Sequence, residues 1–203
     1  PHVINNSWAC PPVEGCTDVN ALKSVVEAVR AAGILVVASA GNRGSSGCGS
    51  VDWPPATYGA SFSVGASYGG SADDAMADFS SRGPVTVDGS NRLKPDIVAP
   101  GFGVVSSIPG GGYAASSGTS MAGPHVVGAA ALLMSAHPEL IGNPDAIIRT
   151  FKRTAVRHVS AMGCGSIATT VPNNEYGWGR IDVAAAHTNA PGATFDVDHT
   201  TWG

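Results

Sequence analysis

Charged side chains are scarce in this sequence, and no basic surface can be built from them. Asp, Glu, Lys and Arg make up 13% of 203 residues, about half the share usual in soluble domains. The formal net charge is -4 and the calculated isoelectric point is near 5.8. We therefore expect no nucleic-acid partner and no anionic-lipid partner.

Long apolar runs and a targeting segment are also missing. No run reaches the roughly 18–20 apolar residues needed to cross a bilayer, so we expect no membrane partner. The chain opens Pro1-His2-Val3, without an initiating Met or a charged leader. A mature protein or an internal fragment would both begin in this way.

Cysteine is rare, and its four positions do not form a metal motif. No Cys-x-x-Cys or Cys/His spacing indicates zinc. Cys10 and Cys16 bracket a short Pro-rich loop, whereas Cys48 and Cys164 lie in Gly/Ser-rich loops far apart in the sequence. We predict disulfides Cys10–Cys16 and Cys48–Cys164, one of three possible connectivities. Four free thiols are the alternative, while disulfides favour a secreted, extracellular protein.

The sequence is rich in glycine and in short apolar segments that alternate with helical patterns. Hydrophobic residues make up 43% of the chain and glycine contributes 27 positions. Continuous apolar runs such as 34–38 are typical of parallel strands buried on both faces. Strands are expected at 3–8, 34–38, 61–66 and 96–99; helices are expected from Asp18 or Asn20 to Ala32, from Ser120 to Ala136, from Asn143 to Thr154 and from Val183 to His187.

This alternation predicts an α/β fold of three layers, with a mostly parallel sheet and helices on both faces. No internal repeat or domain-scale linker interrupts residues 1–203, so they are expected to belong to one domain. In such sheets, ligands bind beyond the carboxyl ends of the strands. The segments with chemically interesting residues follow those ends.

A serine begins one of the predicted helices in a setting of small residues. Ser120 falls in the first helical turn, where backbone N–H groups lack acceptors and the helix dipole favours negative charge. Gly118, Ala122 and Gly123 would let a substrate backbone approach closely. The alternative is that Ser120 only caps the helix.

The segment around this serine resembles a known nucleophile motif. Gly-Thr-Ser-Met-Ala-x-Pro-His-Val, at 118–126, is the signature of the subtilisin-like serine peptidases. Further segments follow in the family's order, at 5–9, 37–42, 79–84, 94–101 and 177–182. The resemblance thus covers nearly the whole chain and implies the subtilisin-like fold.

The resemblance also implies a role for each matching residue. Ser120 would be the nucleophile, and the Asn42 side-chain amide, with the Ser120 N–H, would hold the oxyanion. A turn residue is the alternative for Asn42. The implied substrate-binding residues are Ser7, Trp8 and Ala9, which would pair with an extended peptide, then Ala38, Ser39 and Ala40, which would line the specificity pocket, and also Gly41 and Thr119. With Pro54-Pro55-Ala56 near its far side, this small, uncharged pocket suits apolar or aromatic side chains.

Two members of the family's catalytic triad are absent from the chain. The triad runs Asp, His, Ser, and both upstream motifs precede the segment with which this chain begins. We therefore expect a C-terminal portion of one peptidase domain, inactive alone, whose partners are a peptide substrate and the upstream segment. His125 does not replace the base, because five helical residues place it roughly 140° round from Ser120. His2 fits no triad motif, and the default for His137, His158, His187 and His199 is a surface or capping role.

The sequence leaves alternative functions open, and it bears on which cofactors are expected. A non-catalytic fragment or pseudoenzyme that binds extended peptides is one alternative; an esterase is disfavoured because the Gly-x-Ser-x-Gly elbow is absent. No cofactor or metal is required for the chemistry. A structural calcium ion is possible at Asp73, Asp74 and Asp78, although a solvated acidic loop accounts for them equally well.

Overall fold

Four parallel strands form the central sheet of the computed structural model, which describes residues 1–69, 74–160, 162–167 and 169–191. They are β1 (Val3–Asn6), β2 (Leu35–Ser39), β3 (Phe62–Ser67) and β4 (Ile97–Pro100), and they lie side by side in chain order. Every residue of β2 and β3 is buried. The continuous apolar runs arise because both faces of the sheet are covered.

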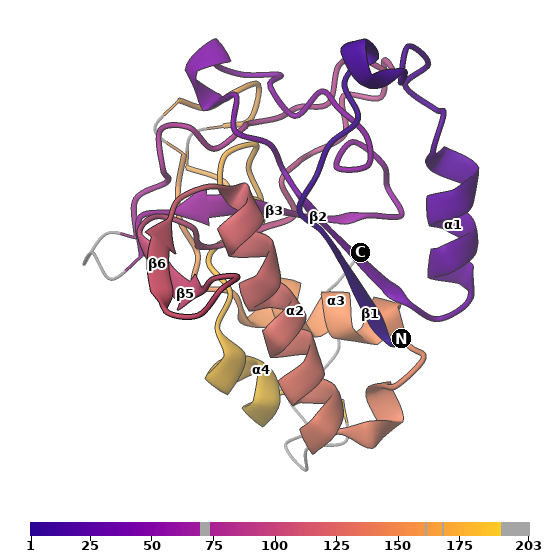
Figure 1. The fold of residues 1–203 in the computed structure, drawn as a ribbon, viewed down its shortest axis with the longest axis vertical. Coiled ribbons are helices and arrows are strands. Elements are labelled where there is room, and N and C mark those ends of the chain that lie inside the picture. The colour runs from indigo at the N-terminus through magenta and orange to yellow at the C-terminus, as the bar shows by residue number, and fades with distance from the viewer. Residues whose placement is uncertain (70–73, 161, 168, 192–203) are drawn as a thin grey trace.

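Helices cover both faces of this sheet, which confirms the predicted three-layer α/β architecture. The longest helix, α2 (Thr119–Ala136), crosses all four strands, with α3 (Pro144–Thr154) and α4 (Val183–Thr188) beside it (Figure 1). The opposite face is covered by α1 (Lys23–Ala31). Adjacent residues of β2 point to opposite faces of the sheet. Val37 packs in the core on the α2 side, and Val36 packs in the core on the α1 side. Short 3-10 turns are η1 (Pro12–Glu14), η2 (Gly44–Ser46) and η3 (Pro138–Leu140).

The predicted start of the first helix is wrong. Helix α1 begins at Lys23, and neither Asp18 nor Asn20 caps it. Asp18 Oδ1 instead accepts the Asn20 N–H at 2.8 Å in a local turn, while Leu22 N–H donates to the Tyr58 hydroxyl. The side-chain acceptor is therefore already used before the helix begins.

Other boundaries agree closely with the sequence patterns. The predicted cap of α3 is confirmed, since Asn143 Oδ1 accepts the Ala146 N–H at 3.1 Å. Helix α2 begins one residue before Ser120, and α4 ends one residue after His187. The first strand ends at Asn6 and does not extend to Trp8.

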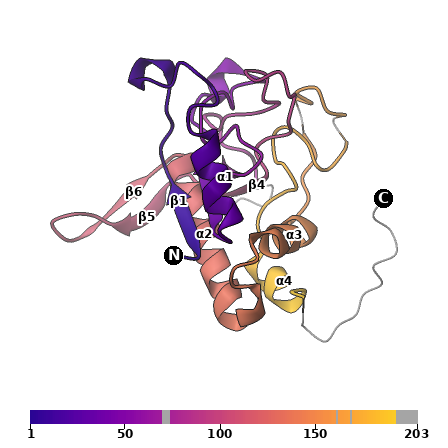
Figure 2. The same ribbon diagram turned by 90° about the vertical axis from the view of Figure 1, so that its right-hand side faces the viewer.

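A β-hairpin that the sequence analysis did not predict precedes α2. Strands β5 (Val104–Ser107) and β6 (Tyr113–Ser116) pair antiparallel, and Figure 2 shows them projecting from the body of the molecule. Three consecutive glycines with positive φ, at 110–112, form the turn. The strands carry no alternating apolar pattern because nearly all of their side chains are exposed.

Two disulfides join the cysteines as predicted. Cys10 pairs with Cys16 and Cys48 pairs with Cys164, with Cα–Cα distances of 5.6 and 5.2 Å. The second bond links segments 116 residues apart. Within the described part of the chain, no helix is both long enough and apolar enough to span a membrane.

A buried lysine and aspartate stabilise the entry to β4. Lys94 Nζ lies 2.5 Å from Asp96 Oδ2 and donates to Ser61 O at 2.6 Å, and its side chain is 2% exposed. Lys152 Nζ approaches the other carboxylate oxygen, Oδ1, at 2.9 Å. Burial alone would raise the pKa of Asp96, but Lys94 and Lys152 hold it below its ordinary value; burial lowers the pKa of Lys94. Nothing in the local sequence around 94–96 indicates this ion pair.

Candidate active site

The candidate site lies where the carboxyl ends of β1 and β2 meet the N-terminus of α2. Ser7 follows β1, Asn42 follows β2, and Ser120 is the second residue of α2. Close packing brings this helix end to the sheet: Gly118 N–H donates to Gly101 O at 2.8 Å. A Cβ at Gly101 would lie 2.9 Å from Gly118 O and 3.3 Å from the Ala122 Cβ, so a side chain there would push the helix away.

Ser120 is partly buried and contacts the segment that follows β1. Its Oγ lies 3.4 Å from Ser7 O, while Ser7 Oγ donates to Ser120 O at 3.0 Å. The Ser120 N–H belongs to the first turn of α2, where the helix offers no backbone acceptor. A hydroxyl and a free N–H thus lie together at the positive end of a helix dipole.

The side-chain amide of Asn42 is oriented by Thr119. Asn42 Oδ1 accepts hydrogen bonds from both Thr119 N–H and Thr119 Oγ1, each at 2.9 Å. Because the oxygen is used twice, Nδ2 is the group left to donate. A Cβ placed on Gly118 would lie 3.3 Å from Asn42 Nδ2, so the amide donor is next to the turn that carries Ser120.

Thr119 also connects α2 to the end of β2. Its hydroxyl accepts the Gly41 N–H at 3.2 Å, and Ser39 Oγ donates to Thr119 O at 3.1 Å. The Thr119 residue is 1% exposed. Two hydrogen-bonded groups, Thr119 with Ser39, Gly41 and Asn42, and Ser120 with Ser7, therefore meet at the peptide bond between Thr119 and Ser120.

The other predicted binding residues lie around these two groups. Trp8 is 49% exposed and Ala9 is partly buried, in the segment just after Ser7. Ala38 and Ala40 are buried in a small core cluster with Val51, Ala56 and Val85. The neighbouring Cys10 N–H donates to Pro54 O at 2.9 Å, which places the 54–56 segment next to the predicted peptide-binding segment.

None of the five histidines in the described residues is hydrogen-bonded to Ser120. His125 Nδ1 lies 2.9 Å from Met121 O on its own helix, as expected from its position around the helix axis. His137 and His187 contact each other at 3.0 Å, and His158 stacks on Tyr176. His2 precedes β1, and His199 lies outside the described residues.

An arginine that the sequence analysis did not assign lies next to the candidate oxyanion residue. Arg43 forms an ion pair with Asp52, and its guanidinium lies 4.5 Å from the centre of the Trp53 ring. Burial raises the pKa of Asp52, although Arg43 acts in the opposite direction. The cluster of Arg43, Asp52 and Trp53 is recognised only from the structure, because no sequence motif indicates it.

The acidic loop proposed for calcium is only partly described. Asp74 Oδ2 lies 2.5 Å from Arg180 Nε, so this carboxylate forms an ion pair with an arginine. Asp73 lies outside the described residues. Among those that are described, no group of three His, Cys, Asp or Glu residues is arranged to hold a metal ion.

Comparisons with known proteins agree with this geometry. The family model described as "Subtilase family" matches residues 1–179. Subtilisin E of Bacillus subtilis (strain 168) is 40% identical over 185 residues, which are 91% of this chain and 40% of that protein. Bacillopeptidase F of the same strain is 37% identical over 200 residues, covering 95% of this chain and 13% of that protein.

Solved structures show the same fold. The self-cleaved protease domain of PatA matches with a TM-score of 0.66 and 29% identity, over 96% of this chain and 63% of that one. The prenylagaramide maturation protease PagA matches with a TM-score of 0.71 and 24% identity, over 94% and 62%. The chain spans about 40% of the length of the subtilisin to which it is similar. The family model, the subtilisin relatives and the fold agree, and the chain belongs to the subtilase family of serine peptidases.

Proposed function

We propose that this chain is the serine-bearing part of a serine endopeptidase domain that becomes active with its upstream Asp and His. The observation that carries the proposal is the orientation of Asn42. Its Oδ1 is held by Thr119, which leaves Nδ2 to donate beside the first turn of α2. A pocket that only bound peptides would not need an amide donor in that position.

The chemistry is acyl transfer. Ser120 Oγ gives its proton to a histidine supplied by the upstream segment and attacks the peptide carbonyl carbon. The carbonyl oxygen becomes an oxyanion, to which Asn42 Nδ2 and the Ser120 N–H donate. Collapse releases the amine, which takes the proton from the histidine, and water then hydrolyses the acyl-enzyme. No cofactor takes part in these steps.

The substrate binds as an extended strand along Ser7, Trp8 and Ala9. Strand β1 is hydrogen-bonded to β2 on one side in the described structure. The segment after it leads directly to Ser120, with which Ser7 shares two hydrogen bonds. A peptide added here would bring its scissile bond to the nucleophile.

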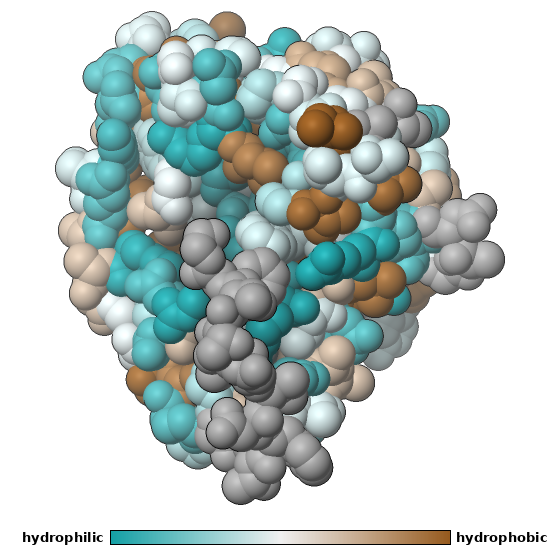
Figure 3. All heavy atoms as spheres, turned by 180° about the vertical axis from the view of Figure 1, so that it is seen from behind, coloured by the Kyte–Doolittle hydropathy of each residue, from teal (hydrophilic) through white to brown (hydrophobic). Residues whose placement is uncertain are grey.

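Exposed apolar side chains support a missing upstream part. Leu132 on α2 is 64% exposed, and Val105 and Tyr113 on the hairpin are 66% and 78% exposed. These elements lie on the face seen in Figure 1, and on the opposite face, in Figure 3, hydrophilic, intermediate and apolar residues are interspersed. Large exposed apolar side chains are candidate contacts for a further segment of protein. We propose that the upstream segment covers these side chains and places the base at Ser120.

We further propose that the domain works outside the cell. Two disulfides persist only where the surroundings are oxidising. Export of the tagged full-length protein, followed by thiol titration under denaturing conditions, tests this. Free thiols in the exported protein would contradict it.

Endopeptidase activity is tested with the full-length protein and a quenched fluorescent peptide library. We expect cleavage by the unmodified protein and none by Ser120→Ala, with cut sites inside the peptides. Tight binding of peptides without cleavage, by a folded full-length protein, would contradict the proposal and favour a peptide-binding pseudoenzyme.

A further inference from the structure

The loop that follows Asn42, residues 43–50, is attached along its length to one segment, residues 78–83. Gly44 N–H donates to Phe79 O at 2.7 Å, and Gly49 N–H donates to Gly83 O at 2.9 Å. A Cβ on Gly44 would lie 2.2 Å from Asp78 O, so only glycine allows this approach. The position of the Asn42 loop is therefore set by the 78–83 segment.

Arg82 of that segment reaches back to the Asn42 loop through its side chain. Its Nη1 donates to Gly44 O at 3.0 Å, a carbonyl two residues after Asn42. Its backbone N–H donates to Ser50 Oγ at 2.9 Å, and Ser50 Oγ donates to Gly47 O at 2.7 Å. Arg82 thus contacts both ends of the loop, Gly44 through a side chain that is only 9% exposed and Ser50 through its backbone N–H.

The charge of this buried guanidinium is balanced by Glu175. Arg82 Nε lies 3.2 Å from Glu175 Oε1, and the glutamate side chain is 5% exposed. The other carboxylate oxygen, Oε2, accepts hydrogen bonds from Ser160 Oγ and, at 3.2 Å, from Met162 N–H. A buried ion pair persists only when its remaining polar atoms are satisfied in this way, and such an arrangement fixes side-chain positions closely.

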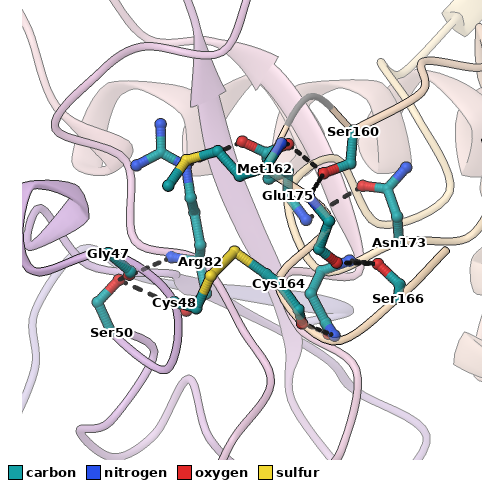
Figure 4. Close-up of a disulfide and its surroundings, with 12 residues drawn as sticks. Gly47, Cys48, Ser50, Arg82, Ser160, Met162, Cys164, Ser166, Asn173 and Glu175 are labelled. Carbon is teal, nitrogen blue, oxygen red and sulfur yellow. Dashed lines mark hydrogen bonds and ion pairs between the residues drawn. A yellow bond between two sulfur atoms is a disulfide. The ribbon is translucent and has the colours of Figure 1, made fainter. Parts of the chain in front are cut away.

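The Cys48–Cys164 disulfide joins the same two parts of the chain. Cys48 belongs to the Asn42 loop, and Cys164 lies in the 160–175 segment that also holds Glu175. Figure 4 shows the disulfide together with Arg82 and Glu175. Asn174 Nδ2 donates to Cys164 O at 2.8 Å, which ties the cysteine back to the residue next to Glu175.

We infer that Arg82 and Glu175 are positioning residues for the oxyanion donor, acting on Asn42 through Gly44 and assisted by the disulfide. The inference rests on the proposed function, because it concerns the reaction proposed above. An oxyanion donor must lie within about 2.7–3.1 Å of the developing charge. A loop attached only by backbone hydrogen bonds could drift beyond this range, and the Arg82–Glu175 pair restricts that drift.

The kinetic test is a double-mutant cycle in the full-length protein. We expect Arg82→Met to lower kcat about tenfold with KM within about twofold, as for a displaced catalytic group. In an Asn42→Ala background the same change should alter kcat by less than about twofold, because the donor that it positions is gone. Equal losses of kcat in both backgrounds would overturn the inference and leave Arg82 a merely structural role.

Two further variants keep the test decisive. If Arg82→Met does not fold, Glu175→Gln, which keeps the shape and removes the charge, enters the same cycle with the same expected coupling. Arg180→Met is the matched control: it removes a partly buried arginine paired with Asp74, with no hydrogen bond to residues 43–50. Arg180→Met should show no coupling to Asn42, and coupling as large as that of Arg82 would overturn the inference.

Hydrogen exchange separates failure of this inference from failure of the proposed function. In the Ser120→Ala protein, Arg82→Met should raise amide exchange in residues 41–50 at least about tenfold, whereas Arg180→Met should leave it unchanged. Unchanged exchange with Arg82→Met overturns the inference whether or not the protein is a peptidase. An unmodified protein no more active than Ser120→Ala contradicts the proposed function instead.

Discussion

Replacing Asp96 with asparagine leaves Lys94 buried without its partner carboxylate. The Lys94 side chain is 2% exposed, and its remaining hydrogen bond in the described structure is to Ser61 O. Removing one member of a buried ion pair typically costs about 3–5 kcal/mol. Lys94 can limit the cost by losing its proton. The ordinary pKa of lysine is 10.5, which is 3.5 pH units above pH 7. At about 1.36 kcal/mol per pH unit, deprotonating Lys94 at pH 7 therefore costs about 5 kcal/mol.

The same reasoning predicts how the cost of Asp96→Asn changes with pH. In the variant, burial lowers the Lys94 pKa of the folded state, so the unfolded state binds more protons between that pKa and 10.5. The stability of the variant therefore rises with pH over this range. Deprotonating Lys94 costs only about 2 kcal/mol at pH 9. The loss in free energy of unfolding relative to the unmodified protein should therefore fall from about 3–5 kcal/mol at pH 7 to about 2 kcal/mol at pH 9.

Urea unfolding of the full-length protein at pH 7 and pH 9 measures both quantities, in a Ser120→Ala background that prevents self-digestion. Adding Lys94→Met to Asp96→Asn removes the buried charge and should recover most of the lost stability. A cost below about 1 kcal/mol at pH 7, or an equal cost at both pH values, would refute the reasoning, because only an exposed or already neutral lysine would behave so.

Three substitutions around the oxyanion donor should each lower the kcat of peptide hydrolysis by the full-length protein, by different amounts. Asn42→Ala should lower kcat by about 10²–10³ with little change in KM; the magnitude is that known for loss of this amide in subtilisin itself. Thr119→Val keeps the shape but removes the hydroxyl that donates to Asn42 and accepts from Gly41. It should lower kcat about tenfold, as for one or two lost hydrogen bonds, and an unchanged kcat would contradict the orienting role. Gly118→Ala puts a methyl group 3.3 Å from Asn42 Nδ2 and should lower kcat, whereas a rise would show that the donor lies elsewhere.

Local chemistry in the sequence predicted the elements that position the site. The motif at 118–126 placed Ser120 in the first turn of a helix, and Asn143-Pro144 marked the start of the next one. The apolar runs at 34–38 and 61–66 identified strands that are buried on both faces. These features depend on residues close together in the chain, so a sequence pattern contains them.

Features that depend on distant residues were not predictable in the same way. The Arg82–Glu175 pair spans 93 residues, and nothing in either local sequence indicates the other. Asp18 is a residue type that often caps helices, but its carboxylate accepts a hydrogen bond from the Asn20 N–H in a turn. The 104–116 hairpin has exposed strands and therefore lacks the alternation by which strands are found. Each miss reflects tertiary contacts or solvent exposure that override local preference.

Labelling with a fluorophosphonate tests the central claim most directly. The reagent is applied to the 203-residue chain and to the same chain joined to its natural upstream sequence, and the modified residue is found by peptide mass mapping. Circular dichroism establishes that each form is folded. We predict labelling of Ser120 in the extended form only, because the base that activates Ser120 lies upstream. A folded extended form that is not labelled at Ser120 would contradict the claim that this serine is a peptidase nucleophile.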